Sequence, residues 1–352
     1  MLTARENYIR NARFQRPEYI PVTIYVSSAS LVEGREELEK IMAKYPEFFP
    51  GFVPGKIDYD NYKFLPEETI GEMIDPWGCK WRCSVNGIVG TVVEHPLSDW
   101  SAMENFTPPP VLPQNAQRIT GDWESERKSI EQARKRGELT WGYIYHGFYF
   151  MRLQYLRGFT NLMCDLIEEP PQLWQLIEII KNHTAEIIKK YLEIGVDVMY
   201  FGEDLGTQTS SMVSPEMFAK YVTPVYKELM QPVRQAGTLV YLHSDGHVLE
   251  LIDELEQAGV QIINIQDLVN GIDALAREVK GRFCISLDVD RQTVVPFGTR
   301  SDIHNLIEEE VRKLGSPEGG LQFIVGIYPP TPPESVDALC EAFRKFRTYW
   351  WD

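Results

Sequence analysis

Acidic and histidine side chains follow two apolar runs in the second half of this sequence. Glu203 and Asp204 come directly after the run at 196–202, and His243 ends the run at 238–243, with Asp245 two residues later. A histidine near several carboxylates, beside a flexible glycine, is typical of a functional site. We therefore predict that His243, with Glu203 and Asp245, forms the catalytic centre.

Other polar and aromatic residues lie at corresponding positions near the predicted strand ends. Those that we assign to substrate binding are Asp204, Gln208, Tyr143, Tyr145, Asp288 and Tyr328. A residue after a strand often only caps the next helix, and this is our interpretation of Asp267. His146 is interpreted as a structural residue, and His183 as a surface one. The aromatic residues of 141–149 either line the substrate site or only pack in the hydrophobic core.

The charge of the chain restricts its partners. The sequence has 35 basic and 51 acidic residues, a net charge of -16. This excess argues against a nucleic acid or an anionic membrane as the main partner. Five carboxylates are expected at the candidate site, namely Glu203, Asp204, Asp245, Asp288 and Asp290. Such a site repels a polyanion and attracts a metal ion or a neutral or cationic substrate.

Short apolar runs alternate with amphipathic stretches, which predicts repeated β/α units. The runs that we read as strands are 20–26, 141–149, 196–202, 238–243, 260–265, 282–287 and 321–326. Repeated units of this kind form a parallel sheet, either an eight-stranded barrel or an open sheet. No Gly-rich phosphate loop follows the first run, so the usual sign of a dinucleotide-binding open sheet is absent. The eighth strand of a barrel has no clear place in the sequence.

Residues 70–120 interrupt the alternation. The stretch Trp81 to Val93 predicts a β-hairpin that turns at Asn86-Gly87. We interpret 70–120 as an insertion over a single barrel domain that spans 1–352, after an N-terminal extension. Five scattered cysteines, no secretory leader and no apolar run of about 20 residues predict a cytoplasmic protein.

Several motifs together resemble the uroporphyrinogen decarboxylase superfamily over roughly residues 140–350. They are Gly202-Glu203-Asp204-Leu205-Gly206-Thr207-Gln208, His243-Ser244-Asp245-Gly246, Asp290-Arg291-Gln292 and Pro332-Pro333-Glu334-Ser335. Asp75-Pro76-Trp77-Gly78 is similar to the methyltransferase-like branches of that superfamily. The resemblance implies a (β/α)8 barrel, in agreement with the alternation of strands and helices.

The decarboxylase branch of that superfamily fits this sequence poorly. True uroporphyrinogen decarboxylases carry a basic N-terminal signature whose arginines hold the substrate's carboxylates. Here the corresponding stretch is Asn11-Ala12-Arg13-Phe14-Gln15-Arg16-Pro17, without that signature. Each buried carboxylate without a cationic partner costs several kcal/mol, of the order of 2–5.

The resemblance to the corrinoid-dependent methyltransferases of the superfamily implies a zinc ion and a corrinoid on a partner protein. Many of these bind zinc through a His-x-Cys pair and a later cysteine. Here His243 matches, but Asp245 stands in place of the first cysteine, and Val325-Gly326-Ile327-Tyr328 offers none. We therefore predict zinc held by His243 with Glu203 or Asp245. The expected reaction is methyl transfer from a small donor, such as a methoxylated aromatic compound. The alternatives are a decarboxylase or a non-catalytic barrel.

Overall fold

A computed structural model of the protein describes residues 2–115 and 118–351. Its contacts fall into two units, which are described one at a time. The terminal unit comprises Met1–Ile70, Cys83–Gly90 and Asn264–Asp352, and the central unit comprises Gly71–Arg82 and Thr91–Ile263. Strand β10 (Ile262–Gln266) is divided between them. No helix of the described residues is long and apolar enough to cross a membrane.

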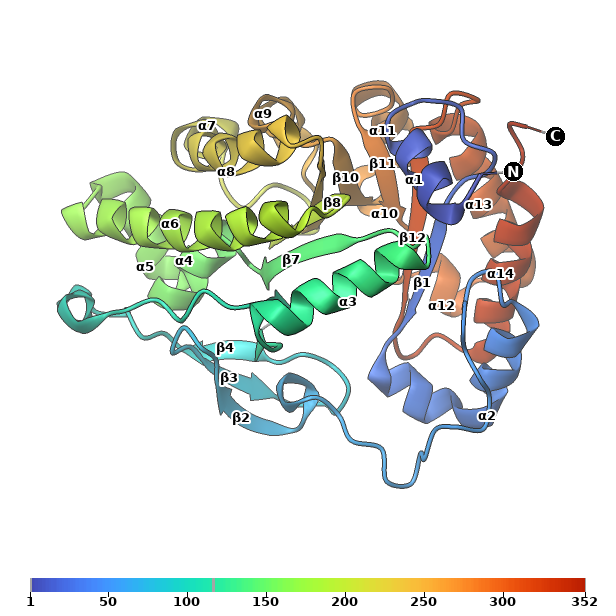
Figure 1. The fold of residues 1–352 in the computed structure, drawn as a ribbon, viewed down its shortest axis with the longest axis horizontal. Coiled ribbons are helices and arrows are strands. Elements are labelled where there is room, and N and C mark those ends of the chain that lie inside the picture. Colours follow the sequence, from blue (N-terminus) through green and yellow to red (C-terminus); the bar gives the residue numbers. More distant parts are fainter. Residues whose placement is uncertain (1, 116–117, 352) are drawn as a thin grey trace. The chain divides into compact units, whose positions relative to one another are not determined.

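Three parallel strands form the centre of the central unit. They are β7 (Trp141–His146), β8 (Val198–Asp204) and β9 (Leu239–Asp245). The helices of this unit are α3 (Trp123–Lys135), α4 (Phe150–Arg157), α5 (Phe159–Glu168), α6 (Pro171–Ile194), α7 (Pro215–Tyr221), α8 (Thr223–Gln235) and α9 (Ile252–Ala258). Helix α6 begins at a proline and ends at Gly195 in the left-handed conformation, and it packs on α8 (Figure 1).

A small antiparallel sheet belongs largely to the stretch that we read as an insertion. Its strands are β2 (Gly71–Ile74), β3 (Lys80–Cys83) and β4 (Thr91–Glu94). Strand β3 pairs with β4, with Trp81 opposite Val92. Residues 84–90 connect these two strands, so the connection includes Asn86-Gly87, where the sequence predicts the hairpin to turn. A two-stranded pair, β5 (Gln114–Asn115) and β6 (Arg118–Ile119), follows.

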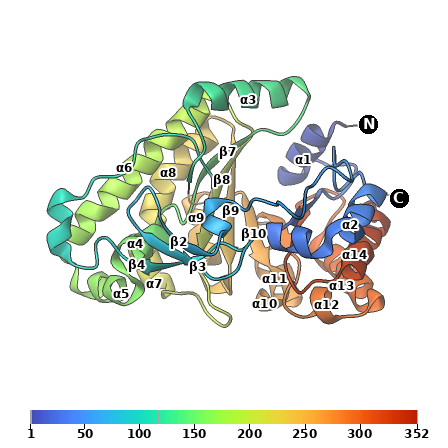
Figure 2. The ribbon, with the colours of Figure 1, turned by 90° about the horizontal axis from the view of Figure 1, so that it is seen from below.

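The terminal unit has its own parallel strands, β1 (Val22–Val26), β12 (Leu321–Ile327) and β11 (Cys284–Asp288). Its helices are α1 (Ala4–Ala12), α2 (Ser28–Lys44), α10 (Asp267–Asn270), α11 (Ile272–Glu278), α12 (Val294–Phe297), α13 (Arg300–Leu314) and α14 (Pro333–Phe346). Helices α13 and α14 lie side by side, and α14 also contacts α2 (Figure 2). Their apolar faces are buried, as the three- and four-residue spacing of the sequence predicts.

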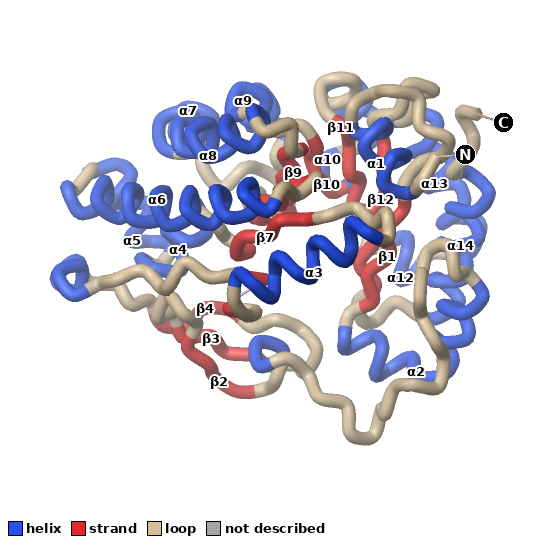
Figure 3. The backbone as a smooth tube through the Cα atoms, in the orientation of Figure 1, coloured by secondary structure: helices blue, strands red, loops and turns tan. Residues whose placement is uncertain are grey.

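All seven predicted strands are present, and they are the only parallel strands assigned in residues 2–115 and 118–351. The protein is therefore of the α/β class, with one parallel strand fewer than the predicted eight. After α2 the chain forms no further parallel strand but runs as a long loop to the 3-10 helix Pro66–Glu68 (Figure 3). Four prolines between residues 46 and 66 explain this, because proline cannot donate to a strand ladder.

Candidate functional site

The strands β7, β8 and β9 place their same-face side chains in rows. Because residues two apart on a strand share a face, paired positions on neighbouring strands line up. The rows, from mid-strand to the carboxyl ends, are Tyr143–Tyr200–Tyr241, His146–Gly202–His243 and Asp204–Asp245. The candidate site is the pair of rows nearest the strand ends.

A strand irregularity brings His146 into its row. Strict alternation would place Tyr143 and His146 on opposite faces of β7. The pairing of β7 with β8 shifts register between these two residues, so that Tyr143 lies opposite Tyr200 and His146 opposite Gly202. Such a bulge re-aims a side chain. His146, which the sequence led us to interpret as structural, therefore joins His243.

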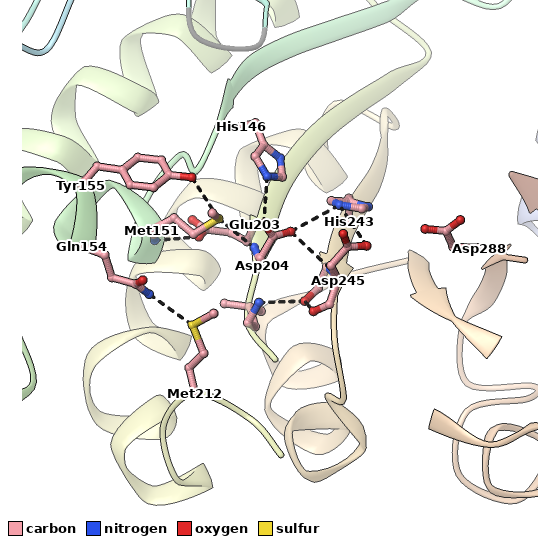
Figure 4. A network of polar contacts seen from close by, with 12 residues as sticks. His146, Met151, Gln154, Tyr155, Glu203, Asp204, Met212, His243, Asp245 and Asp288 are labelled. Carbon is pink, nitrogen blue, oxygen red and sulfur yellow. Dashed lines mark hydrogen bonds and ion pairs between the residues drawn. The ribbon is translucent and has the colours of Figure 1, made fainter. Parts of the chain in front are cut away.

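His146, Asp204 and His243 form a compact group (Figure 4). Nε2 of His146 lies 3.3 Å from Oδ2 of Asp204, and Nε2 of His243 lies 3.5 Å from Oδ1. One nitrogen or oxygen from each residue lies within 4.8 Å of the others. The three side chains are 31%, 27% and 16% exposed, so the group is shielded but reachable.

This group has the chemistry of a metal site. Catalytic zinc is held by three nitrogen or oxygen ligands, and a fourth position stays open for water or substrate. Asp204 faces the two imidazoles with different oxygens, Oδ2 towards His146 and Oδ1 towards His243, and one nitrogen or oxygen of each residue lies within 4.8 Å of the others. Two imidazoles and a carboxylate are a donor set that zinc accepts. The three residues therefore fit a zinc ion by the chemistry of their donors.

Asp204 carries the negative charge of the group. Burial raises the pKa of its carboxyl, but hydrogen bonds and charge interactions with His146 and His243 outweigh burial and hold the pKa well below the ordinary value. Asp204 is consequently ionised at neutral pH, as a metal ligand must be. The sequence assigned Asp204 to substrate binding, whereas its contacts suit a ligand.

Asp245 lies at the edge of this group. Its Oδ1 is 3.8 Å from Nε2 of His243, and its backbone N–H donates to Oδ1 of Asp204 at 3.4 Å. Asp245 and His243, which the sequence predicts to act together, are thus close in space. Asp245 is outside the set of three, and its side chain is 38% exposed.

Glu203 faces the other side of β8, because it alternates with Asp204. Its carboxylate accepts hydrogen bonds from the backbone N–H groups of Tyr149, Phe150 and Met151, at 2.6, 2.9 and 2.8 Å. These are the first N–H groups of α4, which a carboxylate stabilises. Burial raises the pKa of Glu203 to about 8, although the three donors lower it. Its contacts indicate that Glu203 anchors α4. The metal candidate is therefore the group of His146, Asp204 and His243, which shares only His243 with the predicted set of His243 with Glu203 or Asp245.

The predicted substrate residues are scattered. Tyr143 lies in the aromatic row and is half-buried, with its pKa raised to about 12 by burial. Tyr145 is buried on the opposite face, and its ring lies 6.0 Å from Trp77. His183, which we read as a surface residue, is also buried here, 4.8 Å from Trp77. Gln208 is exposed on the loop after β8.

Asp288 and Tyr328 belong to the terminal unit, so their role at this site stays a prediction. Within that unit, Arg291 connects the two residues. Its Nη2 donates to Oδ2 of Asp288 at 2.9 Å, and its Cζ lies 5.4 Å from the centre of the Tyr328 ring. The Tyr328 ring is also 6.2 Å from that of Tyr25.

Sequence reasoning missed His146, Tyr200 and Gly202 as site residues. The alternation of Tyr200, Gly202 and Asp204 along one strand was a usable signal, because these residues share a face with a carboxylate. The inward position of His146 had no such signal, since it depends on the irregularity in β7.

Comparisons with known proteins agree with the fold. The family model described as uroporphyrinogen decarboxylase (URO-D) matches residues 149–346. Uroporphyrinogen decarboxylase 2, chloroplastic, of Arabidopsis thaliana is 23% identical over 198 residues, covering 54% of this chain and 47% of its own length. The uroporphyrinogen decarboxylase of Homo sapiens is 22% identical over 192 residues, or 51% and 49% of the two chains.

The chain thus spans about half the length of the curated relatives that it matches. Among solved structures, a methyltransferase from Methanosarcina mazei superimposes with a TM-score of 0.64 and 14% identity. The match covers 98% of this chain and 99% of that one. At this identity the likeness shows a shared fold.

Proposed function

Because this chain belongs to the uroporphyrinogen decarboxylase family, we propose that it is an enzyme that moves a methyl group from a small donor to a corrinoid on a separate protein. One observation carries the proposal. His146, Asp204 and His243 bring two imidazoles and a carboxylate together near the carboxyl ends of three parallel strands. In α/β barrels the reacting groups are placed at these ends.

The donor that we propose is a methoxylated aromatic compound, as in O-demethylase systems. A zinc ion held by His146, Asp204 and His243 would polarise the oxygen from which the methyl group departs. The oxygen left behind after the methyl group has departed would take up a proton from water, and Asp245, a partly exposed carboxylate beside His243, borders the place where that water would stand. The half-buried ring of Tyr143, one row below, offers an apolar surface to an aryl group.

Decarboxylation of a porphyrinogen is the second candidate, and the names of the curated relatives favour it. The charge of the site argues against it. Asp204 is ionised and lies beside a second carboxylate, that of Asp245. A substrate with many carboxylates needs cationic partners instead. We therefore expect no decarboxylation of uroporphyrinogen by the purified protein.

A corrinoid assay tests the proposal. The protein, loaded with zinc, is mixed with a reduced corrinoid protein and a panel of methoxylated aromatic donors, and methylation is followed by the corrinoid absorbance. We expect the methyl-corrinoid to form with the wild type and not with the His243→Ala variant. No methylation with any donor, together with turnover of uroporphyrinogen, would replace our proposal with the second candidate.

A further inference from the structure

Two side chains of the site lie against the backbone of Gly202. A Cβ atom at this position would lie 2.8 Å from Nδ1 of His146 and 3.1 Å from the hydroxyl oxygen of Tyr200. These two polar atoms therefore border the same small space beside the backbone of β8. The absence of a side chain on Gly202 is what allows both to come so close to the strand.

The ring of Tyr200 is fixed by the aromatic rings around it. It stacks on Tyr241 with a centroid separation of 5.5 Å and an interplanar angle of 27°, and it contacts Tyr143 at 5.7 Å. It is also nearly parallel to the ring of His243, at 6.5 Å and 20°. Because these contacts hold the ring, the hydroxyl has little freedom beyond rotation of its hydrogen.

We propose that the Tyr200 hydroxyl is the hydrogen-bond partner of Nδ1 of His146 and makes this imidazole present Nε2 to the metal ion. This inference rests on the proposed metal site. It makes Tyr200 a positioning residue, which acts through His146. Histidines that bind metal ions usually have such a partner on their second nitrogen, and the partner fixes both ring orientation and tautomer.

The hydroxyl can serve His146 in both states, because a tyrosine hydroxyl donates and accepts. Without a metal ion, the tautomer with its proton on Nε2 donates to Oδ2 of Asp204, 3.3 Å away, and Nδ1 can accept from the Tyr200 hydroxyl. With a metal ion at Nε2, the imidazole proton lies on Nδ1 and is donated to the Tyr200 oxygen. The imidazole stays neutral in both states, so only the tautomer and the direction of the hydroxyl change.

Zinc affinity tests this role without reference to catalysis. Tyr200→Phe removes only the hydroxyl and keeps the ring contacts. Loss of such a partner costs roughly 10- to 100-fold in metal affinity. We therefore expect the dissociation constant for zinc, measured by competition with a chromogenic chelator, to rise by about that factor, with the melting temperature of the zinc-free protein unchanged. The matched control is Tyr241→Phe, which removes a hydroxyl from the same row, and it should bind zinc like the wild type.

The inference would be overturned if Tyr200→Phe and the wild type bound zinc equally well. It would also be overturned if the Tyr241→Phe control lost as much zinc affinity as Tyr200→Phe, or if the wild type bound no zinc. A second measurement needs no variant: nitrogen NMR of the zinc-bound wild type, with labelled histidines, should find the His146 proton on Nδ1. A proton on Nε2 would also overturn the inference. If the zinc effect is present but no methyl transfer is found, the proposed reaction fails and the role of Tyr200 stands.

Discussion

Oδ2 of Asp204 lies 3.3 Å from Nε2 of His146, although the two residues come from different strands and sequence alternation alone would not bring them together. The second oxygen of the same carboxylate faces His243. One carboxylate thus holds two imidazoles in place. This arrangement makes Asp204 the residue on which the site depends most.

Asp204→Asn should remove metal binding while leaving the fold intact. Asparagine has the same shape, but it carries no charge to balance a zinc ion. We expect zinc affinity to fall by more than about 100-fold, beyond what loss of an outer partner costs. Competitive zinc titration measures this, with circular dichroism as the check on folding. Asp245→Asn is the control, and we expect its zinc affinity to fall by less than about tenfold. Equal losses of zinc affinity in the two variants would contradict the assignment of Asp204 as a ligand.

Gly202→Ala should disturb the same site sterically. The new Cβ would come within 2.8 Å of both His146 Nδ1 and the Tyr200 ring, so one of the two side chains must move. Overpacking of this kind typically costs about 1–3 kcal/mol of unfolding free energy. We expect this loss in urea unfolding, together with weaker zinc binding. Gly121→Ala is the control, because its Cβ would meet nothing within 4 Å; the same loss in both variants would show that the contact with His146 is unimportant.

The sequence predicted the strands well and the orientation of the side chains less well. The strands are apolar runs between turn residues, and all seven lie within a few positions of their predicted places. Glu203, Asp204 and Asp245 were predicted to follow the strands, whereas they are the last residues within them. Alternation then sends Glu203 to α4 and Asp204 to the histidines. Strand β8 thus extends two residues beyond the apolar run, which the apolar pattern does not reveal. This extension is what makes Glu203 a support for α4 and Asp204 a candidate metal ligand.

The Asp75-Pro76-Trp77-Gly78 motif has a structural explanation in a buried ion pair. Nη1 of Arg152 lies 3.1 Å from Oδ2 of Asp75, and the two side chains are 0% and 1% exposed. Removing one partner of such a pair leaves a buried charge and costs about 3–5 kcal/mol. We expect Asp75→Ala to lose that much unfolding free energy in urea. Glu72→Ala, which breaks the exposed pairs with Lys80 and Arg82, should change the unfolding free energy far less, because exposed ion pairs contribute little.

Similar losses in Asp75→Ala and Glu72→Ala would mean that the buried pair does not anchor this segment. The comparison is informative because both acidic residues lie in the same short stretch of chain and both face an arginine.

A buried carboxyl group in the terminal unit should make stability depend on pH. Glu310 of α13 is fully buried, and burial and the nearby Asp267 raise its pKa well above the ordinary value. A raised pKa means that the folded protein keeps a proton that the unfolded chain releases. Stability is thus complete below the unfolded pKa and falls as the pH rises towards the folded one, by up to about 1.4 kcal/mol for each pH unit.

Glu310→Gln removes this titration and should flatten the decline. Urea unfolding of both proteins at several values from about pH 5 to about pH 9 measures the difference. An unchanged slope in the variant would show that Glu310 does not supply the pH dependence. Glu309→Gln, a half-exposed neighbour on the same helix, is the control and should keep the wild-type slope.

The central claim is that a zinc ion on His146, Asp204 and His243 is required for methyl transfer. The most direct measurement is the methyl-transfer rate of the chelator-treated protein as zinc is added back. We predict no activity without zinc and a linear rise that ends near one equivalent per chain. Full activity in the metal-free protein, unchanged by added zinc, would contradict the account.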